Sequence, residues 1–343
     1  MGLIMKENFW EGKRVLVTGA TGLIGSWLTE ALANGGANVT AFVKKDDPIG
    51  IDSIKHLENK VKFQYGDIRD IRTIVSPIKN QDVIFHFAAI TQVIYSIRNP
   101  NETREVNVNG TANILEAMRR FADKGFLVFA STDKVYGEPL YNPIDEKHPL
   151  SSKSPYDESK LAADRLVYSH FTEYGAKGSI VRWSNTIGGR DSNILRACPD
   201  FITSVLKGKP PLIRGNGEHI RDFMFVDDVV NASMTVAEKQ NKSVGEVFNF
   251  GTGKPTKVID LAKIIIRLTG NEGKMEPIIM NKPTPGEIAR QYLLAEKARK
   301  KLGWRPQYGL EDGLKKCIDW YKDNRWWVEV IERVSKYYNI KAG

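Results

Sequence analysis

Tyr156 and Lys160 are the residue pair in this sequence best suited to moving a proton. They lie four positions apart in SPYDESKLAADRL, a stretch with a helical pattern, so both side chains are expected on one helical face. A lysine ammonium beside a phenol favours the phenolate and should lower the tyrosine pKa from its usual ~10. Such a phenol can take a proton from a substrate hydroxyl and return it. Thr132, after an apolar run, supplies a hydroxyl to orient the same substrate oxygen.

Asp133 and Lys134 follow Thr132 directly and offer a second acid–base pair at the same place. A carboxyl and an amine side by side can remove one proton and donate another within one reaction. The same two residues can also form a local ion pair without any chemical role. Both interpretations stay open from the residues alone.

Three glycines, Gly19, Gly22 and Gly25, join an apolar run to a helical pattern in VLVTGATGLIGSWL. Gly19 allows a tight turn, Gly22 lets the backbone approach a pyrophosphate, and Gly25 lets the helix pack closely on the strand. The helix start presents free N–H groups and the positive end of its dipole. The pattern therefore predicts a nicotinamide dinucleotide site in this turn. The other residues of the turn expected to contact the dinucleotide are Thr21, Leu23 and Ile24.

The end of the second predicted strand bears on which dinucleotide fits. An acidic residue there would hydrogen-bond the ribose 2′-hydroxyl of NAD. Here the strand ends at Val43 and is followed by Lys44, Lys45, Asp46 and Asp47. The two lysines can neutralise the 2′-phosphate of NADP, whereas either aspartate can reach the ribose of NAD. Both cofactors stay open.

Short apolar runs alternate with amphipathic, helix-length stretches through the first half of the chain. This alternation predicts an α/β fold with a Rossmann-type, doubly wound parallel sheet, which binds ligands at the carboxyl ends of its strands. The predicted strands are Arg14–Thr18, Asn38–Val43, Val61–Tyr65, Asp82–Ala88, Phe126–Ser131 and Ser179–Trp183. The predicted helices include Leu23–Ala33, Glu105–Phe121 and Tyr156–Tyr174.

The alternation becomes irregular after about Gly188, which indicates a smaller C-terminal lobe interleaved with the first domain. We expect a dinucleotide-binding domain over residues 1–186, with 222–248 returning to it. Residues 187–221 and 249–343 would form the substrate lobe. The last stretch, Leu310–Tyr338, has a helical pattern and carries Trp320, Trp326 and Trp327, for which we expect a core or packing role.

The composition excludes several classes of protein. The 50 basic and 41 acidic residues of the 343 give a net charge of +9, but they are mixed along the chain, which indicates no nucleic-acid partner and suits an anionic substrate. No apolar run approaches the ~18 residues of a membrane span, so no membrane partner is expected. The first residues lack a signal-peptide pattern, so we expect a cytoplasmic protein. Cys198 and Cys317 are far apart in the sequence and predict neither a disulfide framework nor a metal site.

Together these features resemble the extended short-chain dehydrogenase/reductase family, in its NAD-dependent epimerase/dehydratase branch, over nearly the whole chain. The motifs that carry the resemblance are TGATGLIG, GDIRD, HFAA, NVNGTANILEA, STDKVYG, YDESK, RWSNTIGG, RDFMFVDDV, FNFGTG and PGE…KKLGW. The resemblance implies an enzyme that passes a hydride between a nucleotide-diphosphate sugar and bound NAD or NADP, with NAD slightly favoured.

The resemblance also assigns roles to individual residues. It implies Thr132, Tyr156 and Lys160 as a catalytic triad, with a homodimer formed through helices around Glu105–Phe121 and Tyr156–Tyr174. The implied cofactor contacts beyond the glycine turn, Tyr156 and Lys160 are Lys44, Lys45, Asp67, Ile68, Ala88, Ala89 and Asn107. The implied substrate contacts are Gln92, Asn185, Arg221 and Arg290, the two arginines binding the diphosphate.

The residues after Thr132 bear on the reaction. Within the family, 4-epimerases usually carry small, inert residues there, whereas 4,6-dehydratases carry an acid–base pair. Asp133-Lys134 and the opening FWEGKRVLVTGATGLIGSWL look like CDP-glucose 4,6-dehydratases, while RDFMFVDDV is closer to epimerases and dTDP-glucose dehydratases. We therefore expect a nucleotide-sugar 4,6-dehydratase, with a 4-epimerase as the alternative. A non-catalytic, cofactor-binding relative is more remote, because such proteins often lose the Tyr–Lys pair.

Overall fold

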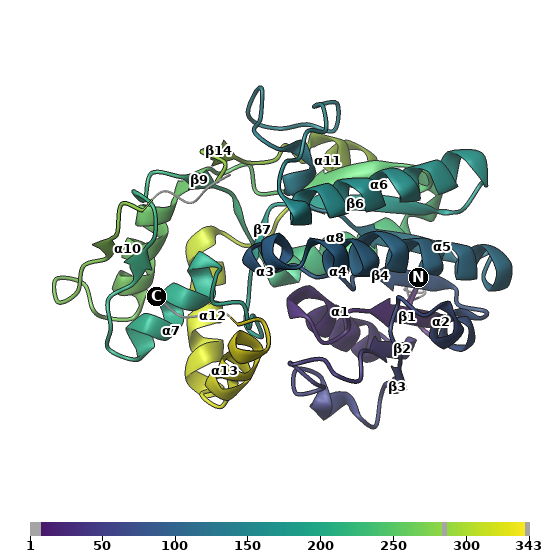
Figure 1. Ribbon diagram of the computed structural model, residues 1–343, viewed down its shortest axis with the longest axis horizontal. Coiled ribbons are helices and arrows are strands. Elements are labelled where there is room, and N and C mark those ends of the chain that lie inside the picture. The colour runs from purple at the N-terminus through teal and green to yellow at the C-terminus, as the bar shows by residue number, and fades with distance from the viewer. Residues whose placement is uncertain (1–7, 283–286, 340–343) are drawn as a thin grey trace, which may run out of the picture.

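The predicted parallel strands form one sheet in the computed structural model, which describes residues 8–282 and 287–339 (Figure 1). The sheet has seven parallel strands in the order β3-β2-β1-β4-β5-β6-β11. The strands are β1 (Arg14–Thr18), β2 (Asn38–Val43), β3 (Lys62–Tyr65), β4 (Val83–His86), β5 (Phe126–Ala130), β6 (Gly178–Trp183) and β11 (Val247–Phe250). The strand order reverses between β1 and β4, so this sheet has its ligand crevice at their carboxyl ends. The predicted fold class is confirmed.

Alternate residues of the central strands face two helical layers. Leu16 of β1 and Phe129 of β5 lie in a core with α2, α5 and α6, whereas Val15 and Val17 lie in a core with α1 and α8. These helices are α1 (Leu23–Asn34), α2 (Ile71–Ile78), α5 (Gly110–Phe121), α6 (Pro155–Glu173) and α8 (Val226–Glu238). Between β4 and α5 lie two short helices, α3 (Val93–Arg98) and α4 (Pro100–Arg104).

The predicted helix Glu105–Phe121 differs in its first turn. Residues Glu105–Asn109 form a π-helical turn, and the α-helix begins only at Gly110. A π turn inserts one residue per turn and commonly marks a functional site. Here the turn contains Asn107, whose side chain is buried.

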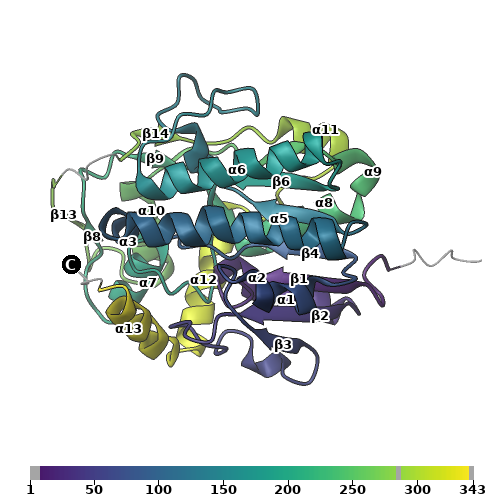
Figure 2. The same cartoon turned by 45° about the vertical axis from the view of Figure 1, so that its right-hand side comes forward.

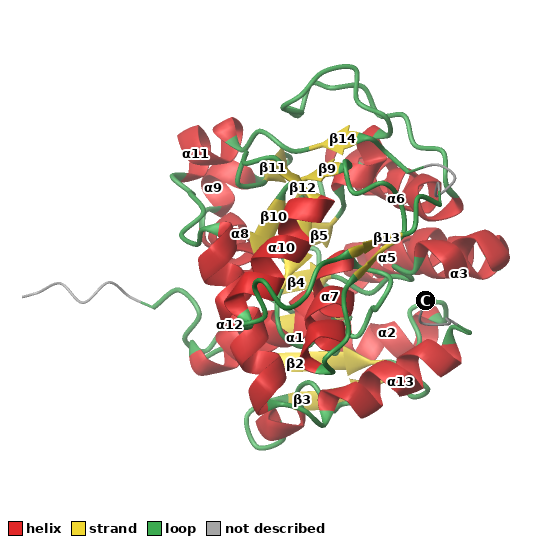
Figure 3. Ribbon diagram, turned by 90° about the vertical axis from the view of Figure 1, so that its left-hand side faces the viewer, coloured by secondary structure: helices red, strands yellow, loops and turns green. Residues whose placement is uncertain are grey.

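The second lobe is built from helices and small sheets (Figure 3). Its helices are α7 (Ala197–Leu206), α10 (Val258–Leu268), α12 (Leu310–Asp323) and α13 (Trp327–Tyr337). Its short strands are β7 (Asn185–Ile187) with β10 (Phe223–Phe225), β8 (Leu212–Ile213) with β13 (Ile278–Ile279), and β12 (Thr256–Lys257) with β9 (Ile220–Arg221) and β14 (Arg290–Gln291). Two remaining short helices are α9 (Gln240–Ser243) and α11 (Glu296–Leu302).

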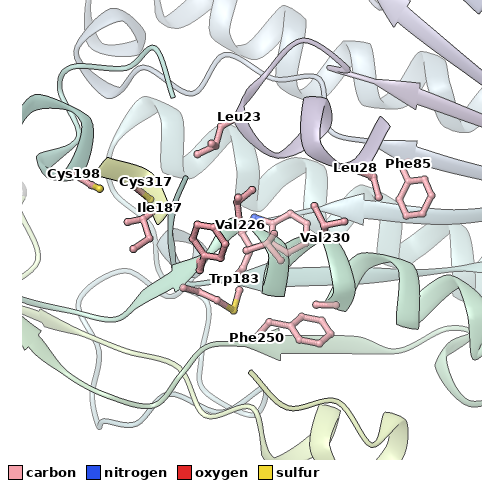
Figure 4. Close-up of a cluster of buried hydrophobic side chains, with 14 of the residues drawn as sticks. Leu23, Leu28, Phe85, Trp183, Ile187, Cys198, Val226, Val230, Phe250 and Cys317 are labelled. Carbon is pink, nitrogen blue, oxygen red and sulfur yellow. The ribbon is translucent and has the colours of Figure 1, made fainter. Parts of the chain in front are cut away.

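One hydrophobic core runs through both lobes (Figure 4). It extends from Leu28 and Phe85 in the large sheet region to Cys198 and Cys317 on α7 and α12. Both cysteines are buried free thiols, and Cys198 is close enough to act with burial in raising the pKa of the Cys317 thiol. Their distance in the sequence therefore did not indicate their proximity in the fold.

The chain returns to the large sheet after entering the second lobe. Helix α8 packs on α1, and β11 pairs with β6, Val247 opposite Ile180. Strand β10, at the start of the expected returning segment 222–248, pairs with β7 outside the large sheet. The domain boundaries themselves stay a prediction.

The tryptophans of the last stretch divide between core and surface. Trp327 is fully buried in the core, whereas Trp326 is 47% exposed and packs edge to face on Trp327. Among the described residues, no helix is long and apolar enough to cross a membrane. The same residues contain no cluster of potential metal ligands.

A buried ion pair joins α6 to β6 beneath the carboxyl edge of the sheet. Arg182 contacts Asp164 at 2.7 Å, and Ser131 donates to the same carboxylate at 2.6 Å. We expect Asp164→Leu to lower the free energy of unfolding by about 3–5 kcal/mol, because it leaves the Arg182 charge buried and uncompensated. Denaturant unfolding would measure this loss. Adding Arg182→Met should recover most of it, and a double variant as unstable as the single one would contradict the explanation.

Candidate functional site

The turn between β1 and α1 leaves no room for side chains at two of its glycines. Gly19 has φ +69°, and a Cβ there would lie 2.7 Å from the backbone nitrogen of Ala88. A Cβ on Gly25 would lie 2.0 Å from the Gly19 carbonyl oxygen. The first glycine thus brings the turn against the segment after β4, and the second seats α1 against the turn.

The same turn fits a dinucleotide pyrophosphate. A Cβ on Gly22 would meet only the Gly19 carbonyl, at 3.4 Å, so the backbone there is open. Among the described residues, no side chain caps the N-terminus of the 12-residue helix α1. Nearby along the carboxyl edge, buried oxygens of Gln92, Ser184 and Thr186 have no hydrogen-bond partner within the described protein. Polar atoms in that state are suited to a polar ligand.

The four residues after β2, from Lys44 to Asp47, make different contacts. Asp47 accepts the Thr21 hydroxyl at 2.6 Å, which ties this loop to the glycine turn, and burial raises the Asp47 pKa. Lys44 lies 3.4 Å from the Tyr337 hydroxyl on α13. Lys45 and Asp46 are exposed. Thr21 is therefore directed at Asp47.

The segment after β3 also lies at this edge. Asp67 pairs with Arg69 at 2.7 Å, and its pKa stays below the usual range because the salt bridge outweighs burial. Ile68 is buried, and a Cβ on Gly110 of α5 would lie 2.6 Å from it. The contact of Asp67 and Ile68 with a cofactor stays a prediction.

Asn107 connects the segment after β4 to α6. Its amide donates to the Ile90 carbonyl at 3.0 Å and to the Ser159 hydroxyl at 2.9 Å, and its oxygen accepts the Ile90 N–H at 2.8 Å. The preceding Ala88 N–H donates to Thr18 at 3.2 Å, and Ala89 is half-buried beside it. The bonds of Asn107 are thus to protein groups, so Asn107 positions this segment.

Thr132, Tyr156 and Lys160 meet where β5 and α6 approach each other. Ser154 caps α6 by accepting the Asp157 N–H at 3.2 Å, which fixes the first turn that carries Tyr156. The Thr132 hydroxyl donates to Asp133 at 3.2 Å and lies close enough to Tyr156 to lower the pKa of its phenol. The structure therefore brings the predicted triad together.

The prediction that Lys160 lowers the Tyr156 pKa is wrong for the protein without bound ligands. The surrounding protein displaces water from the phenol and raises the Tyr156 pKa. The Lys160 ammonium instead donates to the Ala130 carbonyl at 2.6 Å and lies 4.5 Å from the centre of the Phe129 ring. Burial lowers the Lys160 pKa to about 8.

Arg196 is a site residue that the sequence did not reveal. Burial raises the Tyr156 pKa, and among the neighbouring groups the Arg196 charge lowers it most. An ion pair with Asp191 at 3.2 Å holds the guanidinium. Arg196 lies in the loop before α7, where neither periodicity nor motif spacing distinguishes it from a surface arginine.

Asp133 and Lys134 lie beside the triad and are only loosely paired. Their closest charged atoms are 3.9 Å apart, and one carboxylate oxygen of Asp133 is buried without a hydrogen-bond partner among the described residues. Lys134 donates to the side chain of Gln291, whose amide in turn donates to the Asp133 carbonyl at 2.8 Å. Burial lowers the Lys134 pKa despite the Asp133 charge. Gln291, from the second lobe, was also missed from the sequence.

The expected substrate residues are placed unequally. Arg221 is mostly buried, 3.7 Å from Glu287, and close enough to lower the Lys134 pKa by its charge. The register pairs Arg221 with Gln291, whereas Arg290 is exposed with its guanidinium over Tyr292. The structure therefore joins Arg221, but not Arg290, to the acid–base pair.

The two other expected substrate residues lie before α3 and at the start of β7. Gln92 directly precedes α3, and its buried side-chain oxygen has no hydrogen-bond partner among the described residues. Asn185 begins β7 and donates its side-chain amide to the Asp222 carbonyl at 3.4 Å. Their contact with a substrate stays a prediction.

Comparison with known proteins identifies the family. A family model described as GDP-mannose 4,6 dehydratase matches residues 16–317. A Methanocaldococcus jannaschii protein provisionally named UDP-glucose 4-epimerase is 37% identical over 315 residues, which is 90% of this chain and 99% of that one. Human dTDP-D-glucose 4,6-dehydratase is 34% identical over 324 residues, 91% of each chain.

Two solved structures share the fold closely. DesIV, a dTDP-glucose 4,6-dehydratase from Streptomyces venezuelae with NAD and TYD bound, gives a TM-score of 0.85 at 29% identity, covering 92% of this chain and 99% of its own. UDP-glucose 4-epimerase from Thermotoga maritima with UDP-glucose gives 0.84 at 30% identity, covering 91% and 99%.

The fold, the glycine turn and the Tyr–Lys pair thus define the extended short-chain dehydrogenase/reductases, and the chain belongs to their NAD-dependent epimerase/dehydratase family. It is an NAD-dependent enzyme that acts on a nucleotide sugar as a 4,6-dehydratase or a 4-epimerase. Its relatives do not support CDP-glucose in particular.

The lowered Lys160 pKa can be measured directly. In protein carrying ¹³Cε-lysine, we expect one signal to titrate near pH 8, well below the ordinary lysine value of 10.5. Lys160→Met identifies that signal by its disappearance. Because the unfolded chain keeps its proton to higher pH, the Lys160 contribution should make the folded state more stable as the pH rises from about 8 to 10.5. A Lys160 signal that titrates near 10.5 would contradict this assignment.

Proposed function

We propose that the protein is a nucleotide-sugar 4,6-dehydratase that converts an NDP-hexose to the 4-keto-6-deoxy sugar. The observation that carries this choice is the pair Asp133 and Lys134, both largely enclosed beside Thr132, with a carboxylate oxygen left without a partner among the described residues. A purely structural ion pair would be expected to close to a shorter contact and to satisfy that oxygen.

A nicotinamide dinucleotide held at the turn of Gly19, Gly22 and Gly25 would supply the hydride chemistry that this reaction needs at carbons 4 and 6. Tyr156 takes the proton of the 4-hydroxyl as carbon 4 becomes a ketone, and Thr132 holds that oxygen in place. Lys160 keeps a positive charge near this end of α6 below about pH 8. Arg196 favours the phenolate through its charge.

The new ketone acidifies the hydrogen on carbon 5, and the second pair then acts. Lys134, whose pKa burial lowers, takes that proton as a neutral amine. Asp133, in its protonated carboxyl form, gives a proton to the 6-hydroxyl, which leaves as water while the electron pair from carbon 5 forms the double bond. Gln291 accepts a hydrogen bond from Lys134 and donates one to the Asp133 carbonyl, so it holds the Lys134 side chain near the Asp133 backbone. A hydride at carbon 6 and a proton at carbon 5 complete the product.

The substrate is held by its diphosphate and by the second lobe. Arg221 offers a planar, two-pronged donor to the diphosphate, next to Lys134. Asn185 lies at the same edge, and Arg290 would need to leave Tyr292 to reach the phosphates. CDP-glucose is the first substrate to try because of the Asp-Lys pair, and the relatives named for UDP and dTDP sugars make those nucleotides the next.

A 4-epimerase is the second candidate. It is favoured by the 37% identity to the Methanocaldococcus jannaschii protein and by the fold shared with the Thermotoga maritima epimerase. Such an enzyme needs Tyr156 and Lys160 but no acid at position 133. A non-catalytic role is disfavoured because Thr132, Tyr156 and Lys160 are all present and assembled.

NAD is the proposed cofactor, in keeping with the homologous structures that contain it. The Lys44 ammonium lies near the Tyr337 hydroxyl, so a 2′-phosphate of NADP would have to compete for it. Lys45 is exposed and remains accessible to such a phosphate.

Substitutions separate the two chemical stages. With the correct sugar nucleotide, Asp133→Asn should still reduce the bound cofactor but form the 4-keto-6-deoxy product ~10²–10⁴-fold more slowly, because it lacks the acid for water loss. Tyr156→Phe should abolish cofactor reduction itself. Absorbance at the reduced-nicotinamide band and mass analysis of the products measure the two stages. If Asp133→Asn and Lys134→Ala both keep full turnover, the dehydratase is refuted, and formation of a 4-epimer would establish the alternative.

We also propose a homodimer formed through α5 and α6, which lie side by side on one face of the molecule (Figure 2). Leu161 and Leu166 of α6 and Val106 before α5 are partly exposed on these elements. Ile114 is fully buried in the core of its own chain, so it does not contribute to the interface.

Sedimentation velocity at micromolar concentration should show a dimer. Leu166→Glu should shift it toward monomer, because it places a charge in an apolar contact. Lys263→Glu, a charge change on the distant helix α10, is the matched control and should leave the dimer intact. A wild-type protein that sediments only as a monomer would refute the assembly.

A further inference from the structure

Helix α13 lies beyond the region that the family model matches, which ends at residue 317. It is nevertheless firmly anchored to the second lobe. Trp327 is fully buried and donates its indole N–H to the Asp191 carbonyl at 3.3 Å. One side of the helix then enters the large core through Val330, Ile331 and Val334.

The exposed side of α13 reaches the dinucleotide-binding domain. Arg333 donates to the carbonyls of Pro48 and Ile49, at 2.5 and 3.1 Å, and forms an ion pair with Asp52. All three acceptors belong to the loop that follows β2. Burial raises the pKa of Asp47, and the positive charge of Arg333 lowers it. Asp47 is the residue that accepts the Thr21 hydroxyl of the glycine turn.

The end of α13 contacts two segments that lie on opposite sides of β1. Tyr337 is 3.4 Å from Lys44, just after β2, and its ring also faces the lysine ammonium. Tyr338 packs edge to face on Tyr95 of α3, after β4, with the ring centres 4.8 Å apart. The next residue, Asn339, accepts a hydrogen bond from Arg98 at 3.0 Å.

These contacts carry α13 across the carboxyl edge of the sheet at the point where its strand order reverses. Strands β2, β1 and β4 are neighbours in that order. Figure 1 shows α13 next to the loop that follows β2, which Arg333 contacts. A dinucleotide whose pyrophosphate lies on the glycine turn extends its adenosine ribose toward the end of β2. That direction leads to Lys44 and therefore to Tyr337.

We propose that α13 forms the outer wall of the adenosine site, with Tyr337 and Tyr338 covering the ribose and Arg333 fastening the helix to the loop after β2. The proposal rests on the proposed function, in that it takes the glycine turn as the dinucleotide site. The cofactor then leaves only when the Arg333 bonds and the Tyr338–Tyr95 contact open. Slow release suits a reaction in which the cofactor is regenerated in every cycle.

Release of the reduced cofactor tests the role of the two tyrosines. The protein is loaded with NADH and mixed with excess NAD, and the loss of bound NADH fluorescence gives the dissociation rate. We expect the double variant Tyr337→Ala/Tyr338→Ala to release NADH at least about tenfold faster than wild type. Lys336→Ala, an exposed substitution on the same turn, is the matched control and should keep the wild-type rate. Equal rates in all three proteins would overturn the proposal.

Hydrogen exchange on the unaltered protein gives a second test that does not depend on the variants folding. With NAD bound, the amides of α13 should exchange at least about tenfold more slowly, together with those of the glycine turn, while α10 stays unchanged. If NAD slows amide exchange in the glycine turn but not in α13, the proposal that α13 walls the adenosine site is wrong, and the proposed function stands. If wild type binds neither NAD nor NADH, the cofactor assignment of the proposed function fails, and the wall fails with it.

Discussion

Removal of water from a group of ionisable side chains is the constraint on which the chemistry of this protein depends. Tyr156, Lys160 and Lys134 all lie where the carboxyl ends of the strands meet the second lobe. Loss of solvent raises the pKa of the phenol and lowers the pKa of both lysines. Burial therefore opposes loss of the Tyr156 proton, and the charge of Arg196 favours it, whereas both lysines give up their protons more readily than they would in water. The enclosure thus prepares the lysines for acid–base work and makes a positive charge beside Tyr156 necessary.

These side chains can be enclosed because the buried charges beneath them are paired with each other. Asp164 lies on the same helix as Tyr156 and Lys160 and forms a buried pair with Arg182 of the neighbouring strand. The Ser131 hydroxyl joins that pair one residue before Thr132. One helix thus carries both the reacting groups and the carboxylate that holds its own position. A shift of α6 would disturb the ion pair and the proton-transfer groups together.

The glycine turn and the second lobe approach the same crevice from different directions. Gly19 brings the turn against Ala88, and Asn107 links the segment after β4 to α6. Gln291 comes from a part of the chain 157 residues away from Lys134 and yet is its hydrogen-bond partner. Because the hydrophobic core continues from the large sheet to α7 and α12, these contacts are held by packing on both sides. The site is therefore a product of both lobes.

The sequence by itself determined the local features of this protein. Strands β1 and β2 were predicted to the residue, because an apolar run bounded by polar residues and turns is a signal within the segment. The glycine turn and the four-residue spacing of Tyr156 and Lys160 are equally local. The tertiary structure alone decided the features that depend on how distant segments pack. It placed Arg196 near Tyr156, exposed Arg290, brought Cys198 beside Cys317, and carried α13 to Lys44. It also decided the sign of the Tyr156 pKa shift, because burial is a property of the surrounding fold and a neighbouring charge in the sequence does not reveal it.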